Sequence, residues 1–300
     1  MSYILTLVAS TKTAPLTEKH FATLATIIDH YNLKFTSKMV WLDKGKAAEV
    51  GISGNAQSSL VAHLRETLEK ERIDFFIAKN EKRRKKLLLA DMDSTIAVGE
   101  TLDDLAEYAG IKDQVSEITA RAMNGALDFH DALRARVSLL EGLKTTALTA
   151  TLAETKLNEG AETFVRTMRK SGAACVLVSG GFTFFTEAIA ARCGFGFNHG
   201  NTLDIQGDAL TGKVVEPILD KFAKVEFLKH YMNDFSLTED DCLTIGDGAN
   251  DLPMLKMAGL GIGYHPKETV KNELVNCILY GDLTTALYAQ GLSSAHFEKA

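Results

Sequence analysis

The chain has 300 residues, of which 46% are hydrophobic and 24% charged, and its formal net charge at pH 7 is −6. This composition is that of an ordinary globular protein long enough for two cores, and its acidic balance argues against nucleic-acid binding. No apolar run approaches the roughly 20 residues of a membrane span, and the N-terminus lacks the basic segment of a secretory signal. The four cysteines have no C-x-x-C spacing, which favours free thiols in a cytoplasmic protein.

Residues 1–80 are expected to form a separate unit. Its segments follow one another in the order βαββαβ, which suggests a ferredoxin-like α+β domain. The expected strands cover 3–9, 35–42, 47–52 and 73–78, and the expected helices cover 17–30 and 56–71. The unit resembles ACT-type regulatory domains, but its first strand-to-helix loop, TKTAP, has no glycine where ACT ligand sites usually have one. Amino-acid binding is therefore a weaker hypothesis than a structural role or a homodimer formed through this domain.

The basic run 81–86, EKRRKK, follows this unit. A charge cluster can mark a nucleic-acid-binding patch. A single short run in an acidic chain, directly before an apolar strand, instead favours a solvated linker.

The stretch 87–95, LLLADMDST, carries the first chemical signal. Four apolar residues without alternation predict a strand that is buried on both faces, as in a parallel α/β sheet. Asp91 and Asp93 follow it directly. Ligands of such sheets bind beyond the carboxyl ends of the strands, so both carboxylates lie where chemistry is expected. A lone D-x-D motif is still weak evidence, because solvated loop aspartates are common.

From residue 100 to about 157 the pattern is helical. Apolar residues such as Leu133, Val137 and Leu140 recur at helical spacing. Because these helices are inserted between the first and second strands of the expected sheet, we expect a helical cap over the strand ends. A lid that excludes bulk water suits phosphoryl transfer.

A second strand-like run, 173–181, ends in a hydroxyl and two glycines, at Ser179, Gly180 and Gly181. A helix is expected over 182–193, so this turn and the helix N-terminus could hold an anion through backbone N–H groups. Lys224 lies on a further helix, expected over 221–232.

The run 242–251, CLTIGDGAND, leads another apolar strand into Asp247, Asn250 and Asp251. Its glycines permit a sharp turn and a close approach to a ligand. Repeating βα units predict an α/β core with a mainly parallel, Rossmann-like sheet. Carboxylates, a hydroxyl, glycines and a lysine, all at strand ends or helix starts, are typical of phosphoryl transfer.

These segments together resemble the four motifs of the haloacid dehalogenase superfamily: D-x-D-S-T at 91–95, S-G-G at 179–181, Lys224, and G-D-G-A-N-D at 246–251. The stretches GETLDDLAEYAG and ITARAMNGALDFHDALRARVSLL resemble the phosphoserine phosphatases within it. The likeness covers roughly residues 85–290 and implies a core over 81–99 and 156–300, with the cap over 100–155. It also implies Mg²⁺-dependent hydrolysis of O-phospho-L-serine, the last step of L-serine biosynthesis.

The resemblance implies roles for individual residues. Asp91 would attack phosphorus to form an aspartyl-phosphate, and Asp93 would act as general acid and base. Mg²⁺ would be held by Asp91, Asp247 and the backbone carbonyl of Asp93. The residues that would stabilise the transferred group, or orient those that do, are Ser179, Gly180, Lys224, Asn250 and Asp251.

Substrate choice is expected to rest on the cap. In the family, Glu100 takes the place that binds the α-ammonium group, and Arg136 the place that binds the α-carboxylate through its planar fork. Met123 and Phe129 would form an apolar wall. Taken singly, Glu100 could be a helix-start charge, Arg136 a surface residue and Met123 ordinary cap core.

Other functions stay open. The chain could be a non-catalytic sensor that binds serine through its N-terminal domain, or a phosphotransferase that uses an acceptor other than water. A hydrolase of a different small phosphomonoester is the runner-up. A phosphonate hydrolase is disfavoured, because no cap lysine is placed for a Schiff base.

Overall fold

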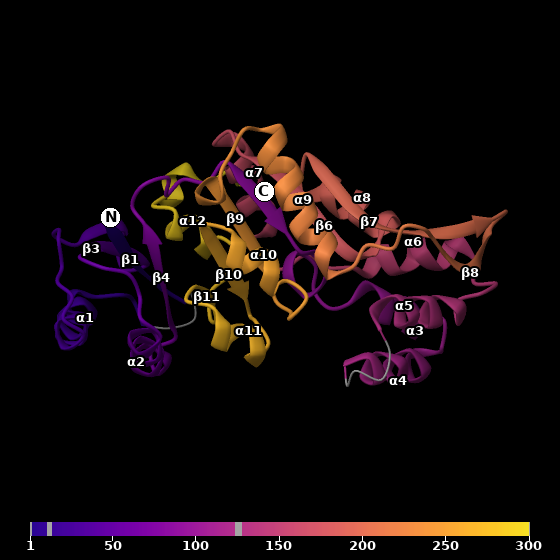
Figure 1. Cartoon of the computed structure of the whole chain (residues 1–300), viewed down its shortest axis with the longest axis horizontal. Helices are drawn as coiled ribbons and strands as arrows, with labels where there is room; N and C mark the ends of the chain where they lie inside the picture. Colours follow the sequence, from indigo (N-terminus) through magenta and orange to yellow (C-terminus); the bar gives the residue numbers. More distant parts are fainter. Residues whose placement is uncertain (1, 11–13, 124–127, 300) are drawn as a thin grey trace.

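The computed structural model describes residues 2–10, 14–123 and 128–299, apart from the side chains of Ala120, Ala122, Met123 and Lys221 (Figure 1). The described chain forms two sheets, one of four strands and one of seven. The four-stranded sheet lies at one end of the molecule and most of the seven-stranded sheet occupies the middle. A group of helices lies at the opposite end, together with a hairpin of the seven-stranded sheet.

The N-terminal sheet is antiparallel and has the strand order β2-β3-β1-β4. Its elements are β1 (Tyr3–Ala9), α1 (Glu18–His30), β2 (Val40–Asp43), β3 (Ala47–Ile52), α2 (Ser58–Glu69) and β4 (Ile73–Lys79). This is the predicted ferredoxin-like arrangement. The prediction of a strand over 35–42 is wrong in its position, because pairing begins only at Val40, and Phe35 contributes a single isolated bridge.

Both faces of the N-terminal sheet are covered. Alternate residues such as Leu5 and Leu7 pack with α1 and α2, whereas Val8 and Phe76 belong to the hydrophobic core of the rest of the chain. The amphipathic character of α1 and α2 accounts for the first layer. Val8 and Phe76, on the other face, show that the N-terminal unit packs against the rest of the chain through buried side chains.

The seven-stranded sheet has the order β11-β10-β9-β5-β6-β7-β8 and is parallel except for the β7–β8 pair. Its strands are β5 (Leu87–Ala90), β6 (Ala174–Phe182), β7 (Phe197–Gln206), β8 (Ala209–Val215), β9 (Cys242–Gly246), β10 (Leu260–Tyr264) and β11 (Cys277–Ile278). β5 is central, and its four residues are fully buried. The predicted α/β class with a mainly parallel sheet is confirmed.

Helices cover both faces of this sheet. Leu88 of β5 belongs to the core that contains α7 (Ala161–Lys170), α8 (Thr183–Cys193) and α12 (Thr285–Ala289). Leu89 belongs to the core that contains α9 (Lys221–Asp234), α10 (Leu252–Met257) and α11 (Glu268–Glu273). Because β5 is buried on both faces of the sheet, its four residues are all apolar and do not alternate with polar ones.

Between β5 and α7 the described residues include the α-helices α3 (Thr101–Tyr108), α4 (Lys112–Met123), α5 (Phe129–Ser138) and α6 (Thr145–Glu154). The two connections to this helical insertion run side by side. Ala97 and Leu157 form an antiparallel bridge, and the Val98 N–H donates to the Lys156 carbonyl over 2.9 Å. Asn158 Nδ2 donates to the carbonyl oxygens of Thr95 and Ala97. These contacts form a stapled neck between the insertion and the core, and a second attachment is the antiparallel bridge between Lys144 and Ala209 of the β7–β8 hairpin.

The prediction of a solvated linker at 81–86 is confirmed in part: four of its six residues are exposed, but Arg83 and Lys85 are not. Lys82 pairs with Asp241 over 2.7 Å, and Lys85 is only 5% exposed, with its ammonium donating to the Asp240 carbonyl over 2.7 Å. Arg83 pairs with Glu49 over 2.7 Å. Lys82 and Lys85 therefore bind the run to the core, and Arg83 joins it to the N-terminal unit.

The four cysteines are free thiols, as predicted, and all four are buried. Among the helices that the structure describes, none combines the length and the hydropathy needed to cross a membrane.

Candidate active site

Asp91 and Asp93 lie where the central strand β5 ends. The Asp91 N–H still donates to the Ile245 carbonyl of β9 over 3.0 Å, so this residue is held in the sheet register. The chain then makes a single wide turn, η1 (Met92–Ile96), closed by a hydrogen bond from the Ala97 N–H to the Met92 carbonyl. Ser94 adopts a positive φ of 56° in this turn, which directs the two aspartates to different partners.

Lys224 lies in the first turn of α9, whose N-terminus is capped by the side chain of Asp220. Its ammonium group is buried and donates to Asp91 Oδ1 and Asp251 Oδ1, each over 2.5 Å. Burial alone would lower the pKa of Lys224, but Asp251 and Asp91 outweigh it and raise that pKa. Lys224 is thus a permanent cation clamped between two carboxylates.

Asp247 and Asp251 follow β9. Asp251 is fully buried, and its Oδ2 accepts the Gly248 N–H over 3.0 Å. A Cβ atom at position 246 would lie 2.5 Å from Asp251 Cγ, so only glycine fits Gly246. Asn250 is exposed, and its side-chain oxygen lies against Gly248. The G-D-G-A-N-D motif therefore folds into a tight turn around the Asp251 carboxylate.

Three buried carboxylates meet at this point. Asp91, Asp247 and Asp251 each offer an oxygen atom, and these oxygens lie within 4.8 Å of one another. Burial raises the pKa of Asp91, as does the adjacent charge of Asp251, while Lys224 opposes both. A hard divalent cation would relieve this repulsion, because it prefers carboxylate oxygens and favours their charged forms. The residues present therefore fit a metal such as Mg²⁺.

The Asp93 side chain is directed away from that cluster. Its Oδ1 accepts hydrogen bonds from the backbone N–H and the hydroxyl of Thr101, and its Oδ2 accepts from the Ser179 hydroxyl, all over 2.8 Å. Ser179 in turn accepts the Gly181 N–H over 2.8 Å. Thr101 was not predicted as a site residue, and only its position at the start of α3, beside Glu100, could have suggested it.

The segment 179–181 is part of β6, which continues to Phe182, and α8 begins at Thr183, one residue later than predicted. A Cβ atom at Gly180 would lie 3.4 Å from the Phe129 ring of α5. Phe129 therefore brings the helical insertion directly over the end of β6. Of Met123, only the backbone in α4 lies within the described part of the chain, so its predicted wall position is not described.

Glu100 precedes α3, and its Oε1 accepts a hydrogen bond from the Ser94 hydroxyl over 3.1 Å. The residue reaches solvent, but desolvation of its carboxyl group and the charge of Asp93 raise the pKa of Glu100 to about 7. Arg136 is half-buried on α5, where burial lowers its pKa against the opposing charges of Asp103 and Glu100. Both predicted specificity residues thus lie within electrostatic range of each other.

Lys267 is a site residue that the sequence did not reveal. Its ammonium lies 3.2 Å from Asp247 Oδ2, and its backbone N–H donates to the Asp247 carbonyl over 3.0 Å. Its positive charge also acts on Glu100 and lowers the pKa of that carboxyl group. Lys267 lies in a loop after β10, outside every motif, so no spacing pointed to it.

Residues 88–256 match the family model described as haloacid dehalogenase-like hydrolase. The match spans more than half of the chain and contains all the motif residues that meet at the ends of β5, β6 and β9. The chain belongs to this family.

Individual relatives of this haloacid dehalogenase-like hydrolase are similar over different lengths. The phosphoserine phosphatase of Lactococcus lactis is 42% identical over 187 residues, which are 62% of this chain and 87% of that protein. The phosphoserine phosphatase of Streptomyces coelicolor is 38% identical over 219 residues, 73% of this chain and 53% of that protein. The chain spans about half the length of several such curated relatives.

The crystal structure of a haloacid dehalogenase family hydrolase from Salmonella enterica serovar Typhi superposes with a TM-score of 0.84 at 26% identity. The superposition covers 96% of this chain and 98% of the Salmonella hydrolase. The similarity to this hydrolase therefore includes the N-terminal unit as well as the core.

Proposed function

We propose that this hydrolase converts O-phospho-L-serine to L-serine and phosphate with the help of Mg²⁺. The observation that carries the proposal is the cluster of Asp91, Asp247 and Asp251 around Lys224, at the end of β5. The similarity to curated phosphoserine phosphatases supports the choice of substrate. The product would place the enzyme in L-serine biosynthesis, in the cytoplasm.

Asp91 is the proposed nucleophile. Lys224 holds one of its carboxylate oxygens, and the other would form a bond to phosphorus while the bond between phosphorus and the serine oxygen breaks. Asp93 would give a proton to the departing serine oxygen. In the second step Asp93 would take a proton from the water that attacks the aspartyl-phosphate, which releases phosphate and restores Asp91.

Ser179 would change partners during this sequence. Its hydroxyl donates to Asp93 Oδ2 over 2.8 Å in the absence of substrate. A bound phosphoryl oxygen offers a competing acceptor for that hydroxyl and for the Gly180 N–H. When the hydroxyl turns to the phosphoryl group, Asp93 Oδ2 is released to carry the proton needed by the leaving group.

The metal would be held by Asp91, Asp247 and the backbone carbonyl of Asp93. When bound, Mg²⁺ supplies positive charge that offsets the charge of the phosphoryl group. Asp251 already accepts from Lys224 and from the Gly248 N–H, so we assign it, with Asn250, to orienting the site.

The amino-acid part of the substrate would lie under α5. Glu100 would bind the ammonium group, Arg136 the carboxylate, and Phe129 would cover the apolar stem. Lys267 weakens the negative field at Glu100, and this observation makes a phosphomonoester without an ammonium group the second candidate substrate.

The N-terminal unit is proposed to be ACT-like and to extend over residues 1–80, with the core over 81–99 and 156–300 and the cap over 100–155. Because both faces of its sheet are covered within the chain, a homodimer would have to use a sheet edge or an outer helix surface. Light scattering after size-exclusion chromatography measures that state.

The test is phosphate release from O-phospho-L-serine, its D isomer and other phosphomonoesters, with and without Mg²⁺, for the wild type and Asp91→Asn. We expect Mg²⁺-dependent release that favours the L isomer and is lost in the variant. Release from other esters alone would retain the mechanism and overturn the roles of Glu100 and Arg136. Absence of release from every ester would overturn the proposed function and favour a sensor.

A further inference from the structure

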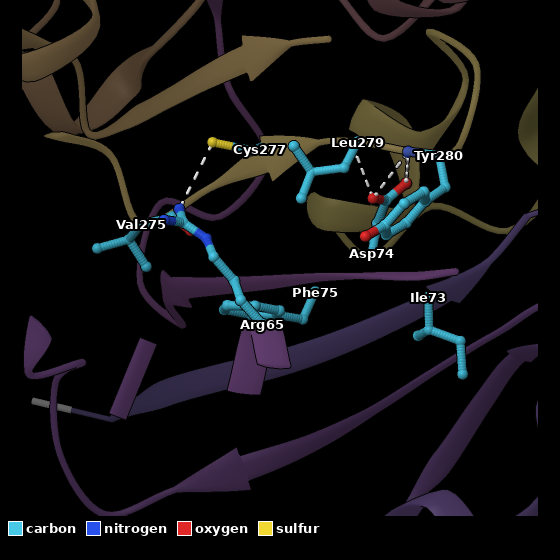
Figure 2. A pocket seen from close by; sticks show the side chains of 8 residues that line it. All are labelled: Arg65, Ile73, Asp74, Phe75, Val275, Cys277, Leu279 and Tyr280. Carbon is cyan, nitrogen blue, oxygen red and sulfur yellow. Dashed lines mark hydrogen bonds between the residues drawn. The ribbon is translucent and has the colours of Figure 1, made fainter. Parts of the chain in front are cut away.

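Polar side chains form hydrogen bonds between the N-terminal unit and a short segment of the core, residues 271–281 (Figure 2). Arg65 of α2 reaches the end of α11, where its guanidinium donates to the Lys271 carbonyl over 2.7 Å and to the Leu274 carbonyl over 2.5 Å. Carbonyl groups at a helix C-terminus lack intrahelical donors, and a cation suits them. Arg65 therefore acts as a cap on α11 that comes from another domain.

Two further contacts fix the same segment. Asp74 of β4 is 2% exposed and accepts the backbone N–H groups of Leu279, Tyr280 and Gly281. The Asn276 side chain accepts the Ile77 N–H over 2.8 Å and donates to the Ile77 carbonyl. The interface closes on a cavity of only about 10 Å³, which is room for a single water molecule. These contacts join the two units, and the cavity between them has no room for a ligand larger than water.

The other end of α11 lies at the active site. The helix has only six residues, so it is about 9 Å long. Lys267 immediately precedes it and is bound to Asp247 twice, through its backbone N–H and its ammonium. Val270, in the middle of the helix, is fully buried against the core. A shift of α11 along its axis would therefore be transmitted to Asp247.

We propose that Arg65 is a positioning residue for the metal site, acting through α11 and Lys267 on Asp247. By capping α11 from the N-terminal unit, Arg65 fixes the helix that orients the Asp247 backbone and carboxylate. The N-terminal unit thus contributes to metal affinity without any residue of its own in the site. This inference rests on the proposed role of Asp247 as a metal ligand.

The experiment titrates Mg²⁺ into the metal-stripped full-length chain by isothermal titration calorimetry, with thermal unfolding measured in parallel. Arg65→Met removes the cap, and we expect the Kd for Mg²⁺ to rise about threefold to tenfold, the range typical of coupling through packed elements. Arg65→Lys retains a donor for the carbonyl groups and should raise the Kd less.

Arg72→Met is the matched control. Arg72 also belongs to the N-terminal unit and lies over the Tyr280 ring, 5.6 Å from its centroid, so its loss weakens the same joint without removing the cap on α11. We expect a lower unfolding temperature but a Kd for Mg²⁺ within about twofold of wild type, as for an independent site.

Equal Kd values for Arg65→Met and Arg72→Met would overturn the proposal, whether both stay unchanged or both rise. An Arg65→Lys protein that binds Mg²⁺ as weakly as Arg65→Met would also contradict it. If Arg65→Met does not fold, Arg65→Lys is compared with Arg72→Met instead, and equal Kd values for these two variants are the contradicting result. If the wild-type protein releases phosphate from O-phospho-L-serine, the proposed function stands whichever of these results is found. A wild-type protein that binds no Mg²⁺ would overturn both the proposed function and the role of Arg65.

Discussion

Asp74 and Asp91 are both buried aspartates with raised pKa values, yet their surroundings differ in kind. Asp74 accepts three backbone N–H groups from one loop, so the fold itself satisfies its carboxylate. Asp91 instead faces Asp247 and Asp251 and shares a single buried cation, Lys224. One carboxylate is used to join two parts of the chain, and the other is held in a repulsive cluster.

The difference shows that burial of a carboxylate does not by itself indicate a catalytic site. A buried charge whose partners are backbone groups is a structural feature, because those partners are available whenever the chain is folded. In the Asp91 cluster Lys224 offsets the like charges only in part, so the cluster favours the binding of a further cation such as a metal ion. Substitutions at these positions should therefore affect stability and activity in opposite ways.

The largest effect is expected for Asp91→Asn. Loss of the nucleophile should lower kcat by about 10³-fold or more. The same change removes one carboxylate from the cluster, so the unfolding temperature of the metal-free protein should rise. Phosphate release and thermal unfolding measure the two effects. If the variant were active and unfolded at a lower temperature than the wild type, Asp91 would have a structural role like that of Asp74.

Glu100→Gln is expected to change the pH profile of kcat/KM. Since the Glu100 pKa is about 7, its carboxylate forms as the pH rises through that value, and wild-type kcat/KM for phosphoserine should rise with it. The variant should lack this rise and be about tenfold to hundredfold slower above pH 8, as for the loss of a hydrogen bond to a charged group. An unchanged profile for the variant would remove Glu100 from ammonium binding.

Asp74→Asn should leave kcat near the wild-type value but lower the free energy of unfolding by about 1 to 3 kcal/mol, because an amide cannot accept all three N–H groups. Burial raises the Asp74 pKa from 3.8 to about 6. The folded state thus binds the proton more tightly, and this stabilisation is full below pH 4 and lost as the pH rises through 6.

Urea unfolding at several pH values tests the Asp74 prediction. The free energy of unfolding should fall between pH 4 and pH 6 more steeply for the wild type than for Asp74→Asn. Parallel curves for the two proteins would show that Asp74 does not titrate in this range.

The smallest effect is expected for Lys82→Met. Burial alone would raise the pKa of Asp241, but Lys82 and Thr238 outweigh it and lower that pKa, so the pair stabilises the fold at neutral pH and less in acid. Lys82 is half-exposed, and the loss should be about 0.5 to 1 kcal/mol. Arg84→Met, at an exposed position in the same basic run, is the control and should have a smaller effect.

Much of the core was predictable because its strands are buried on both faces. The apolar runs of β5, β6 and β9 and the residues that follow them are local patterns. The edge strands were predicted less well: the strand expected from residue 35 is β2, which begins at Val40. Edge strands make fewer contacts, so their residues are less constrained.

The site could be predicted only where its residues belong to motifs. Asp91, Lys224, Asp247 and Asp251 come together as expected from strand ends that meet at one edge of the sheet. Lys267 depends on how a loop returns to Asp247 after β10. Its contact is set by tertiary structure and leaves no periodic trace in the sequence.

The joint between the two sheet units was missed for the same reason. Arg65 and Lys271 are more than 200 positions apart, and a side chain that binds a backbone carbonyl puts no requirement on the identity of its partner. The basic run illustrates the opposite error, because its composition suggested solvent although Lys85 is buried.

The stapled neck at Ala97 and Leu157 has a consequence for the origin of new specificities. The two connections of the helical insertion are paired with each other, but the insertion also pairs with the β7–β8 hairpin through the bridge between Lys144 and Ala209. An exchange of the insertion therefore has to preserve two attachments, the neck beside β5 and the contact with the hairpin. A change of specificity that replaces the insertion requires the hairpin to change with it.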